Sequence, residues 1–405
     1  MFGFTLNEEQ EALRSTVEDF ARAEVAPVIG EYYERGEFPY PIVAKMGKLG
    51  LFGLPFPEEY GGMGGDYLAL CLALHELARV DSSVAITLEA AVGLGAMPIY
   101  RFGSAAQRAE WLPPLCRGER LAAFGLTEPG GGSDIPGGMR TTARLELGEQ
   151  AEQAEWVIDG SKAFITNSGT SITSVVTVLA ITGRAGPRPE ISSIMVPAGT
   201  PGFTVGREYS KVGWCASDTR ELAFSGCRVP EGNLLGQPGR GYAQFLATLD
   251  EGRVAIAALA AGLARGCVDE CLRYVGQRTA FGHQLGHYQA IQFTIADMEA
   301  RARVAQLAWL DAVAAMLSGP AGGSGGSPPR ASSFKKQAAI AKLTASEAAM
   351  DNARAATQIF GGYGFMNEFP VARFYRDAKV LEIGEGTSEV QRMIIARELG
   401  LSRRD

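Results

Sequence analysis

The sequence predicts an α+β protein, mainly helical, in which a small β domain separates two helical regions. Apolar residues recur at helical spacing near the start of the chain, and long alanine-rich stretches follow the middle region. Between them lie short β-branched stretches broken by Gly and Pro, a pattern typical of strands and turns. The clearest of these are Ser174–Ile181, Ile191–Val196 and Gly202–Val205. We therefore expect domains over residues 1–120, 121–235 and 236–405.

The N-terminal domain is predicted to be helical apart from one glycine-rich loop. Asn7, followed three residues later by Gln10, is a typical start signal for the first helix. The loop covers Glu58–Asp66. Two further helices are expected over Tyr67–Val80 and Ser82–Met97, and the second is nearly all apolar and therefore expected to be buried.

The C-terminal domain is predicted to consist of long helices. They are expected from about residue 240 to 275 and over residues 288–317, 332–360 and 388–400. The stretch Ser318–Ser333 is built from Gly, Ser and Pro, so we expect a flexible loop between two of these helices.

Composition and charge exclude several broad classes. The chain has 405 residues, of which 46% are apolar, and its net charge of −7 argues against a general nucleic-acid binder. Val254–Ala264, the longest charge-free apolar run near a helix, is too short to cross a bilayer, so no membrane insertion is expected. Met1–Leu6 lacks a basic start and an apolar run, so no signal peptide is expected.

Cysteine and histidine usage indicates a reducing cytoplasm and gives no metal site. The six cysteines include no C-x-x-C pair, and Cys267 and Cys271 are expected to be half-buried thiols on one helix face. His283 and His287 are four residues apart but are flanked by turn-like glycines, so we expect no metal there. The scattered thiols fit the cytoplasm.

The strongest chemical signal is the segment Thr127–Asp134, which holds three consecutive glycines. Such glycines let main-chain N–H groups come close to a ligand, and Ser133 adds a hydroxyl donor. A plain loop or hairpin is an equal alternative. The spacing matches neither G-x-G-x-x-G nor a P-loop.

Two further segments have ambiguous chemistry. Lys162–Asn167 ends a β segment in which Phe164 could stack on a ring and Thr166 could hydrogen-bond to its edge, although an ordinary half-buried strand is the alternative. Gln358–Phe365 follows a helix, and its paired glycines can either cap that helix or bring main chain against a cofactor.

Glu385 lies between two glycines, just before a helix that Thr387 or Ser388 can cap. A carboxylate on such a turn can be presented into a cavity with little steric hindrance. A solvent-exposed acid in a loop is the alternative from this segment alone.

Together these segments resemble the acyl-CoA dehydrogenase family over nearly the whole chain. The four main matches, in the family's order and spacing, are Thr127–Asp134, Phe164–Asn167, Gln358–Gly364 and Glu385–Arg392. Three supporting matches are Arg278–Gly282, Gln289–Gln292 and Ala372–Ala378. Each motif alone is weak, but seven collinear motifs are highly specific.

The resemblance implies an N-terminal helical domain, a middle β-barrel-like domain and a C-terminal four-helix bundle, with FAD between the last two. The residues that it assigns to FAD are Phe124, Leu126, Thr127, Gly132, Ser133, Phe164, Thr166, Arg278, Phe281, Gln289, Gln358, Gly361, Gly362, Thr387 and Glu389. The six residues from Arg278 to Gly362 would come from a neighbouring subunit. The family is usually tetrameric, so a homotetramer is implied.

The resemblance also implies that Glu385 is the catalytic base. It would abstract the α proton of an acyl-CoA while flavin N5 takes the β hydride, which gives a trans-2-enoyl thioester. Burial should raise the pKa of Glu385 and match it to this task. The implied substrate contacts are Ser133, Asp250, Arg253 and Gly386.

Some family members carry the base on another helix, at the position of Gly252 in this chain. Glycine cannot be a base, and Glu251 is one residue off and would face another side of the helix. This comparison favours Glu385. Two departures from the family pattern are Phe164, where Trp is common but Phe also stacks, and Gly384, where a frequent Tyr is missing and the shape of the thioester pocket changes.

Substrate and partners are implied only in part. Val84–Leu94 should form the floor of the acyl cavity, and it holds no Arg for a second carboxylate, which favours short, medium or short branched acyl chains. Electron-transfer flavoprotein is the expected acceptor. The alternatives are an enzyme that desaturates an acyl group on a carrier protein, an acyl-CoA oxidase, and a non-enzymatic flavin-binding scaffold, which the intact Glu385 disfavours.

Overall fold

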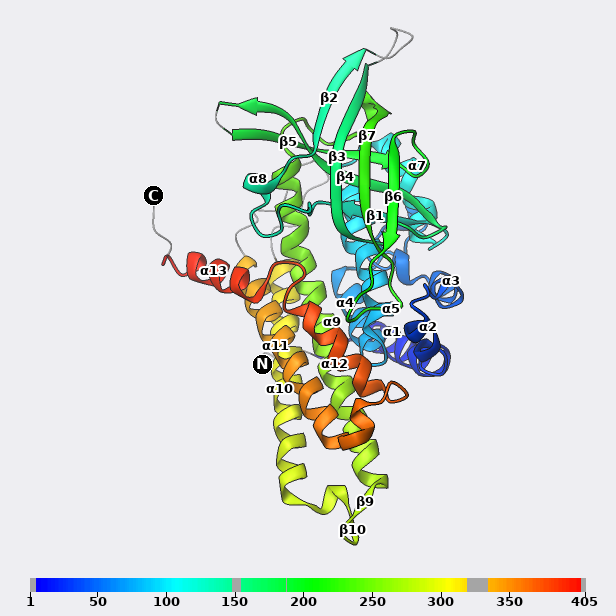
Figure 1. Cartoon of the computed structure of the whole chain (residues 1–405), viewed down its shortest axis with the longest axis vertical. Coiled ribbons are helices and arrows are strands. Elements are labelled where there is room, and N and C mark those ends of the chain that lie inside the picture. Colours follow the sequence, from blue (N-terminus) through cyan, green and yellow to red (C-terminus); the bar gives the residue numbers. More distant parts are fainter. Residues whose placement is uncertain (1–4, 148–153, 187, 319–333, 402–405) are drawn as a thin grey trace.

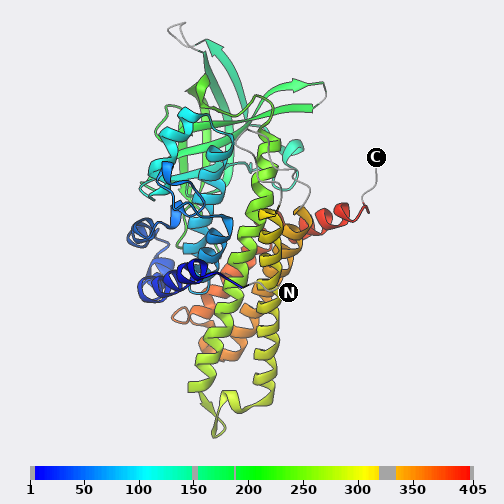
Figure 2. The same ribbon diagram turned by 180° about the vertical axis from the view of Figure 1, so that it is seen from behind.

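The computed structural model describes residues 5–147, 154–186, 188–318 and 334–401. N-terminal helices and a β-sheet lie beside the upper half of a long helical bundle, and the bundle extends well beyond the sheet (Figures 1 and 2). The predicted order of helices, β domain and helices is confirmed.

From residue 5, where the described part of the chain begins, the N-terminal region forms seven α-helices. They are α1 (Glu8–Phe20), α2 (Ile29–Arg35), α3 (Tyr40–Lys48), α4 (Tyr67–Ala78), α5 (Ser82–Glu89), α6 (Met97–Phe102) and α7 (Ala105–Cys116). The side chain of Asn7 accepts from the backbone N–H of Gln10, and the Gln10 side chain accepts from that of Asn7. The predicted capping signal is therefore confirmed.

The apolar helix predicted over residues 82–97 continues to Phe102. It runs through α5, a π-helical turn η4 (Ala90–Ala96) and α6. Within the described residues, Ser82–Phe102 is the one helix long and apolar enough to cross a membrane, but 94% of its apolar window is buried inside the protein. That burial fits a core helix.

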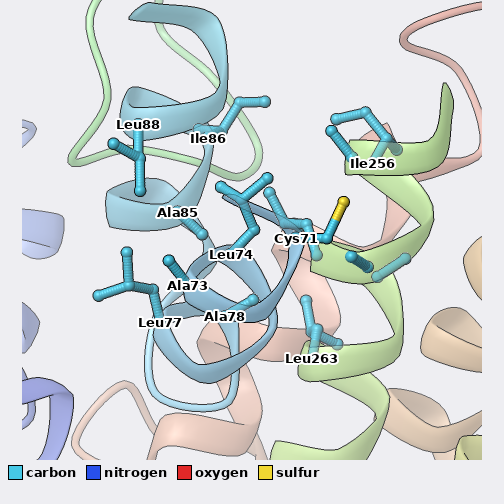
Figure 3. Packing of buried hydrophobic residues seen from close by; sticks show 14 of the residues in the cluster. Cys71, Ala73, Leu74, Leu77, Ala78, Ala85, Ile86, Leu88, Ile256 and Leu263 are labelled. Carbon is cyan, nitrogen blue, oxygen red and sulfur yellow. The ribbon is translucent and has the colours of Figure 1, made fainter. Parts of the chain in front are cut away.

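Figure 3 shows how this core is built. Leu74 and Leu77 on α4 and Ile86 on α5 lie in the same cluster as Ile256 and Leu263 of the long bundle helix α9 (Gly241–Gln277). Each fully buried Leu or Ile contributes roughly 1.5–3 kcal/mol to folding. This packing fixes α5 against α9.

The middle of the chain forms an eight-stranded sheet in the order β6-β7-β3-β2-β4-β5-β8, with β1 paired in parallel to β4. The strands are β1 (Leu121–Gly125), β2 (Thr142–Leu147), β3 (Ala154–Thr166), β4 (Thr173–Ala185), β5 (Arg188–Pro197), β6 (Phe203–Glu208), β7 (Thr219–Pro230) and β8 (Leu234–Leu235). β4, β5 and β6 fall on the three predicted strands. The sheet encloses its own apolar core, which includes Ile158, Val176 and Leu222.

Within its described residues, 236–318 and 334–401, the C-terminal region contains five α-helices. They are α9, α10 (Gln289–Leu317), α11 (Lys335–Phe360), α12 (Pro370–Leu381) and α13 (Ser388–Glu398). Helix α12 had no counterpart among the predicted helices. Cys267 and Cys271 lie on α9 as expected, but both are fully buried rather than half-buried. Apart from Ser318, the predicted loop 318–333 lies outside the described residues.

The element bounds support the domain division that we propose, with boundaries near residues 120 and 235. The first strand, β1, begins at Leu121, and the last strand of the sheet, β8, ends at Leu235. The bundle helix α9 begins soon afterwards.

Candidate active site

Glu385 lies in the turn between α12 and α13, and its backbone is left-handed, with φ 55°. This conformation costs a non-glycine residue about 1–3 kcal/mol, so it persists only where the surroundings enforce it. The side-chain amide of Gln391 does so by donating to the carbonyls of Glu385 at 3.2 Å and Gly386 at 2.8 Å. The turn therefore holds Glu385 in a defined orientation.

Positive φ marks other predicted site residues. Among the described residues, five non-glycine residues have positive φ, and three of these, Glu385, Phe164 and Phe281, were assigned to the site from the sequence. Such strain clusters at functional positions in proteins. The backbone geometry thus independently favours these three residues.

The carboxyl group of Glu385 is turned into the protein toward α9. Its Oε2 atom is buried and has no hydrogen-bond partner among the residues that the structure describes. A Cβ built at Gly252 would lie 2.8 Å from that oxygen, so glycine leaves the room that the carboxyl occupies. Glu251, by contrast, faces α6, where its Oε1 is 2.7 Å from Arg101 Nη1. Neither Gly252 nor Glu251 can therefore act as a base at this point.

Burial sets the protonation of Glu385. It raises the pKa of the carboxyl to about 7, and the positive charges of Arg253 and Lys342 limit the rise. A carboxyl with this pKa is both ionised in part at neutral pH and basic enough to accept a proton from a weak carbon acid.

The pKa of Glu385 predicts a pH dependence. Since a base acts only when ionised, kcat/KM for flavin reduction should rise with pH through about 7 and fall tenfold per unit well below it. Stopped-flow reduction between pH 5.5 and 9 measures this directly. A rate constant that stays flat down to pH 5.5 would contradict a raised pKa.

Lys342 on α11 was not identified from the sequence. Its side chain is fully buried, its Nζ donates to the carbonyl of Gly386 at 2.8 Å, and burial lowers its pKa to about 8. The available signal was its position on the buried alanine face of α11, between Ala341 and Ala345. A lysine on such a face needs a partner, and here the partner is the turn that carries Glu385.

Replacing Lys342 with methionine should move the pH profile. Because the lysine charge lowers the pKa of Glu385, its removal should shift the apparent pKa upward, and loosening of the turn should reduce kcat by roughly ten- to a hundredfold. Lys336→Met, at an exposed position of the same helix, is the matched control. An unchanged profile in Lys342→Met would remove this role.

Asp250 and Arg253, the predicted substrate contacts on α9, form an ion pair with each other and are both buried. Lys335 Nζ lies 3.4 Å from the other carboxyl oxygen of Asp250. The Arg253 charge acts on Glu385. Arg253 therefore keeps a positive charge near the Glu385 carboxyl, and Asp250 holds Arg253 in place.

The two predicted flavin segments near the sheet are tied together by Glu128. Its Oε1 lies 2.8 Å from Nζ of Lys162, and its Oε2 accepts from the backbone N–H of Arg140 at 2.6 Å. Burial by itself would raise the pKa of Glu128, but the positive charge and hydrogen bond of Lys162 have the larger effect. The pKa of Glu128 is therefore below its usual value. The backbone N–H of Ala163 also donates to the carbonyl of Thr127 at 2.8 Å.

The glycine loop and Phe164 fit an aromatic cofactor with phosphates. No atom lies within 4 Å of a Cβ built at Gly130 or Gly132, so the packing of the protein does not require glycine at these two positions. At Gly131 it does, because a Cβ there would lie 2.8 Å from the Cα atom of Gly138. Phe164 exposes 64% of its surface from a strained backbone. Open glycines next to an exposed ring allow close approach of a ligand.

Other predicted cofactor residues surround these segments. Phe124 on β1 stacks on Phe245 of α9 with ring centroids 5.7 Å apart, and Thr166 ends β3. Leu126 is half-buried after β1, and Ser133 is exposed in the glycine loop. Thr387 caps α13 by accepting from the N–H of Val390 at 3.3 Å, whereas Glu389 is exposed in the first turn of that helix.

The remaining predicted cofactor residues do not join this group within one chain. Arg278, Phe281 and Gln289 lie around the turn from α9 to α10, at the end of the bundle opposite the sheet (Figure 1). Gln358, Gly361 and Gly362 lie near them at the end of α11, where Arg278 stacks 5.5 Å above the ring of Tyr363. Gly361, with φ 61°, caps α11, which is one of the two roles that the sequence left open for the paired glycines.

Metal chemistry has no support in the part of the chain that the structure describes. No group of three or more His, Cys, Asp or Glu side chains there could hold an ion. His283 and His287 stack on each other with ring centroids 4.2 Å apart.

Models of all three acyl-CoA dehydrogenase domains match the chain. The N-terminal domain matches residues 7–119, the middle domain residues 123–227 and the C-terminal domain residues 239–400. The chain is 42% identical over 394 residues to the short-chain specific acyl-CoA dehydrogenase of Mus musculus mitochondria, covering 97% of this chain and 90% of that protein.

Two solved structures extend the similarity. Butyryl-CoA dehydrogenase from Megasphaera elsdenii is 38% identical with a TM-score of 0.89, covering 98% of this chain and all of that one. An acyl-CoA dehydrogenase from Bacillus anthracis, solved in complex with FAD, is 33% identical with a TM-score of 0.90, covering 98% of this chain and 68% of that one.

Proposed function

Since the chain belongs to the acyl-CoA dehydrogenase family, we propose that Glu385 is the base of its reaction and that its substrate is a short-chain acyl-CoA. Membership makes the protein an FAD-dependent oxidoreductase that dehydrogenates acyl-CoA. The observation that carries the assignment of Glu385 is its buried carboxyl oxygen, without a partner in the described structure and with a raised pKa. The matched relatives give no support to carrier-protein desaturation, an oxidase or a scaffold.

The chain supplies positioning and proton transfer. The glycine loop, Phe164 and Thr166 would hold FAD, which would supply the hydride acceptor when bound. Glu385 removes the α proton, and Lys342 and Gln391 keep its turn in place. The N–H groups next to Glu385 in this turn would donate to the thioester carbonyl and stabilise the developing enolate charge. Holding the flavin, the acyl thioester and Glu385 in this spatial arrangement supplies much of the rate enhancement.

We further propose a homotetramer in which one subunit completes the cofactor site of another. Arg278, Phe281 and Gln289 are grouped far from the glycine loop of their own chain, and Phe281 is 95% exposed. An aromatic ring so exposed on a strained backbone is unfavourable in an isolated subunit and expected at an interface. Light scattering of the purified protein gives the assembly.

The physiological electron acceptor is inferred from a structural neighbour. One structural neighbour comes from work on an electron-transferring flavoprotein of Acidaminococcus fermentans, with a TM-score of 0.90 and 37% identity. We therefore propose an electron-transfer flavoprotein as acceptor.

We place the protein in the cytoplasm, in line with its scattered free thiols.

The chain-length proposal has a direct test. With an artificial electron acceptor, kcat/KM for butyryl-CoA should exceed that for octanoyl-CoA by at least about tenfold, because each poorly fitting methylene costs about 1–3 kcal/mol. Isobutyryl-CoA in the same assay shows whether branching is accepted. A higher value for octanoyl-CoA would contradict the short-chain assignment and leave the role of Glu385 untouched.

A further inference from the structure

We propose that the acyl cavity accepts acyl-CoA chains that carry a hydroxyl group beyond the β carbon, and that Glu89 is the partner of this hydroxyl. The inference rests on the proposed function, because it assumes that the thioester lies against Glu385. The inference goes beyond that function because it assigns to the acyl cavity a polar end that determines substrate specificity.

Glu89 is the last residue of α5, on the segment Val84–Leu94. Its side chain is wholly buried, and neither carboxyl oxygen has a hydrogen-bond partner or ion pair within the described ranges of the chain. A buried carboxyl without a partner is costly and is retained only where something else satisfies it. Burial, followed by the nearby charge of Glu385, raises the pKa of Glu89 well above its usual value. This shift favours the protonated, uncharged form of the Glu89 carboxyl.

Glu89 and Glu385 border the same small space. A Cβ built at Gly252 would be 2.8 Å from Oε2 of Glu385 and 3.8 Å from Oε1 of Glu89. The two carboxyls thus approach one point on α9 from different elements. An acyl chain whose α carbon stands at Glu385 would pass Glu89 with its following carbons.

A second polar group, on a third element, faces Glu89. Tyr67 on α4 is 5% exposed, and its hydroxyl also lacks a partner among the described residues. A Cβ built at Gly93 would be 2.8 Å from Oε1 of Glu89 and 3.5 Å from the Tyr67 hydroxyl. Gly93 therefore leaves both groups facing a common space.

The chemistry of this space favours a hydroxyl. A neutral carboxyl and a phenol each donate and accept one hydrogen bond, as an alcohol does. Arg101, whose charge acts on the Tyr67 hydroxyl, is already paired with the buried Glu251 and is therefore not available to a distal carboxylate. An ammonium group would require Glu89 to ionise beside Glu385, which is unfavourable.

The test compares two substrates of nearly equal shape, 5-hydroxypentanoyl-CoA and hexanoyl-CoA. In the wild-type protein, kcat/KM should favour the hydroxylated substrate by at least about tenfold, because an apolar end leaves buried polar groups unpaired. Glu89→Leu should reverse the preference, and Glu89→Gln, which still donates and accepts, should retain it. Leu77→Met, in the apolar core on α4 and outside the segment Val84–Leu94, should leave the ratio unchanged (Figure 3).

The possible results separate the two proposals. If the wild-type protein prefers hexanoyl-CoA and Glu89→Leu does not alter this preference, the hydroxyl proposal is overturned and the space beside Glu89 holds only water. Reduction of the flavin by these substrates would still support the proposed function. Failure of all three thioesters, butyryl-CoA included, to reduce the flavin would overturn both. If Glu89→Leu does not fold, the wild-type ratio and Glu89→Gln decide.

Discussion

Replacing Glu385 with glutamine is expected to leave FAD bound but to slow flavin reduction by butyryl-CoA by about 10²–10⁴-fold. The amide has nearly the shape of the acid and can occupy the same space beside Gly252. It cannot accept the α proton, so the loss falls on the chemical step. Stopped-flow measurement of the reductive half-reaction without oxygen gives the rate.

The matched control for this change is Glu382→Gln, three residues earlier in the chain. The partly buried Glu382 side chain pairs with Lys379 at 2.6 Å and makes no hydrogen bond to Glu385 among the described residues. It should keep the wild-type rate. Reduction of the Glu385→Gln protein within a few fold of wild type would mean that another group removes the proton.

Gly252→Ala is expected to lower kcat by about a hundredfold, although it adds only one methyl group far from the cofactor motifs. The new Cβ would lie 2.8 Å from Oε2 of Glu385 and 3.4 Å from its Cδ, which is too close for the present geometry. The carboxyl must move, and a displacement of about 1 Å from the reacting carbon is enough for such a loss.

Stability separates this effect from misfolding. Alanine favours a helix interior over glycine by about 1 kcal/mol, so Gly252→Ala should unfold at a temperature close to wild type. Gly276→Ala, later on α9 and with no atom within 4 Å of its new Cβ, should gain stability and keep full activity. Full activity of Gly252→Ala would show that the Glu385 carboxyl does not need its present position.

Much of the fold could be predicted because periodicity and turn residues agreed along the chain. The capping box at Asn7 and the β-branched strands are local signals, and the structure confirms both. Helix α12 was missed although its buried residues Val371, Phe374, Ala378 and Leu381 recur at helical spacing. Asp377 is fully buried on that helix, where its carboxylate accepts from Tyr33, Ser82 and Trp214. This buried polar residue interrupts the apolar face but does not remove its helical spacing.

The site shows a similar limit. The sequence could identify Glu385 by its motif. It could not show that the backbone of Glu385 has a left-handed conformation or that its carboxyl points toward α9. Lys342 and Glu89 lie 43 and 296 residues before it, on α11 and α5. They meet the turn only through packing of α5, α9 and α11, which no local pattern encodes.

The central claim is most directly tested by adding butyryl-CoA to the purified protein without oxygen while the visible flavin spectrum is recorded. The account predicts a yellow protein whose flavin band bleaches with wild-type Glu385 and stays almost unchanged with Glu385→Gln. A protein that binds no FAD, or one whose flavin bleaches equally fast in both forms, would contradict it.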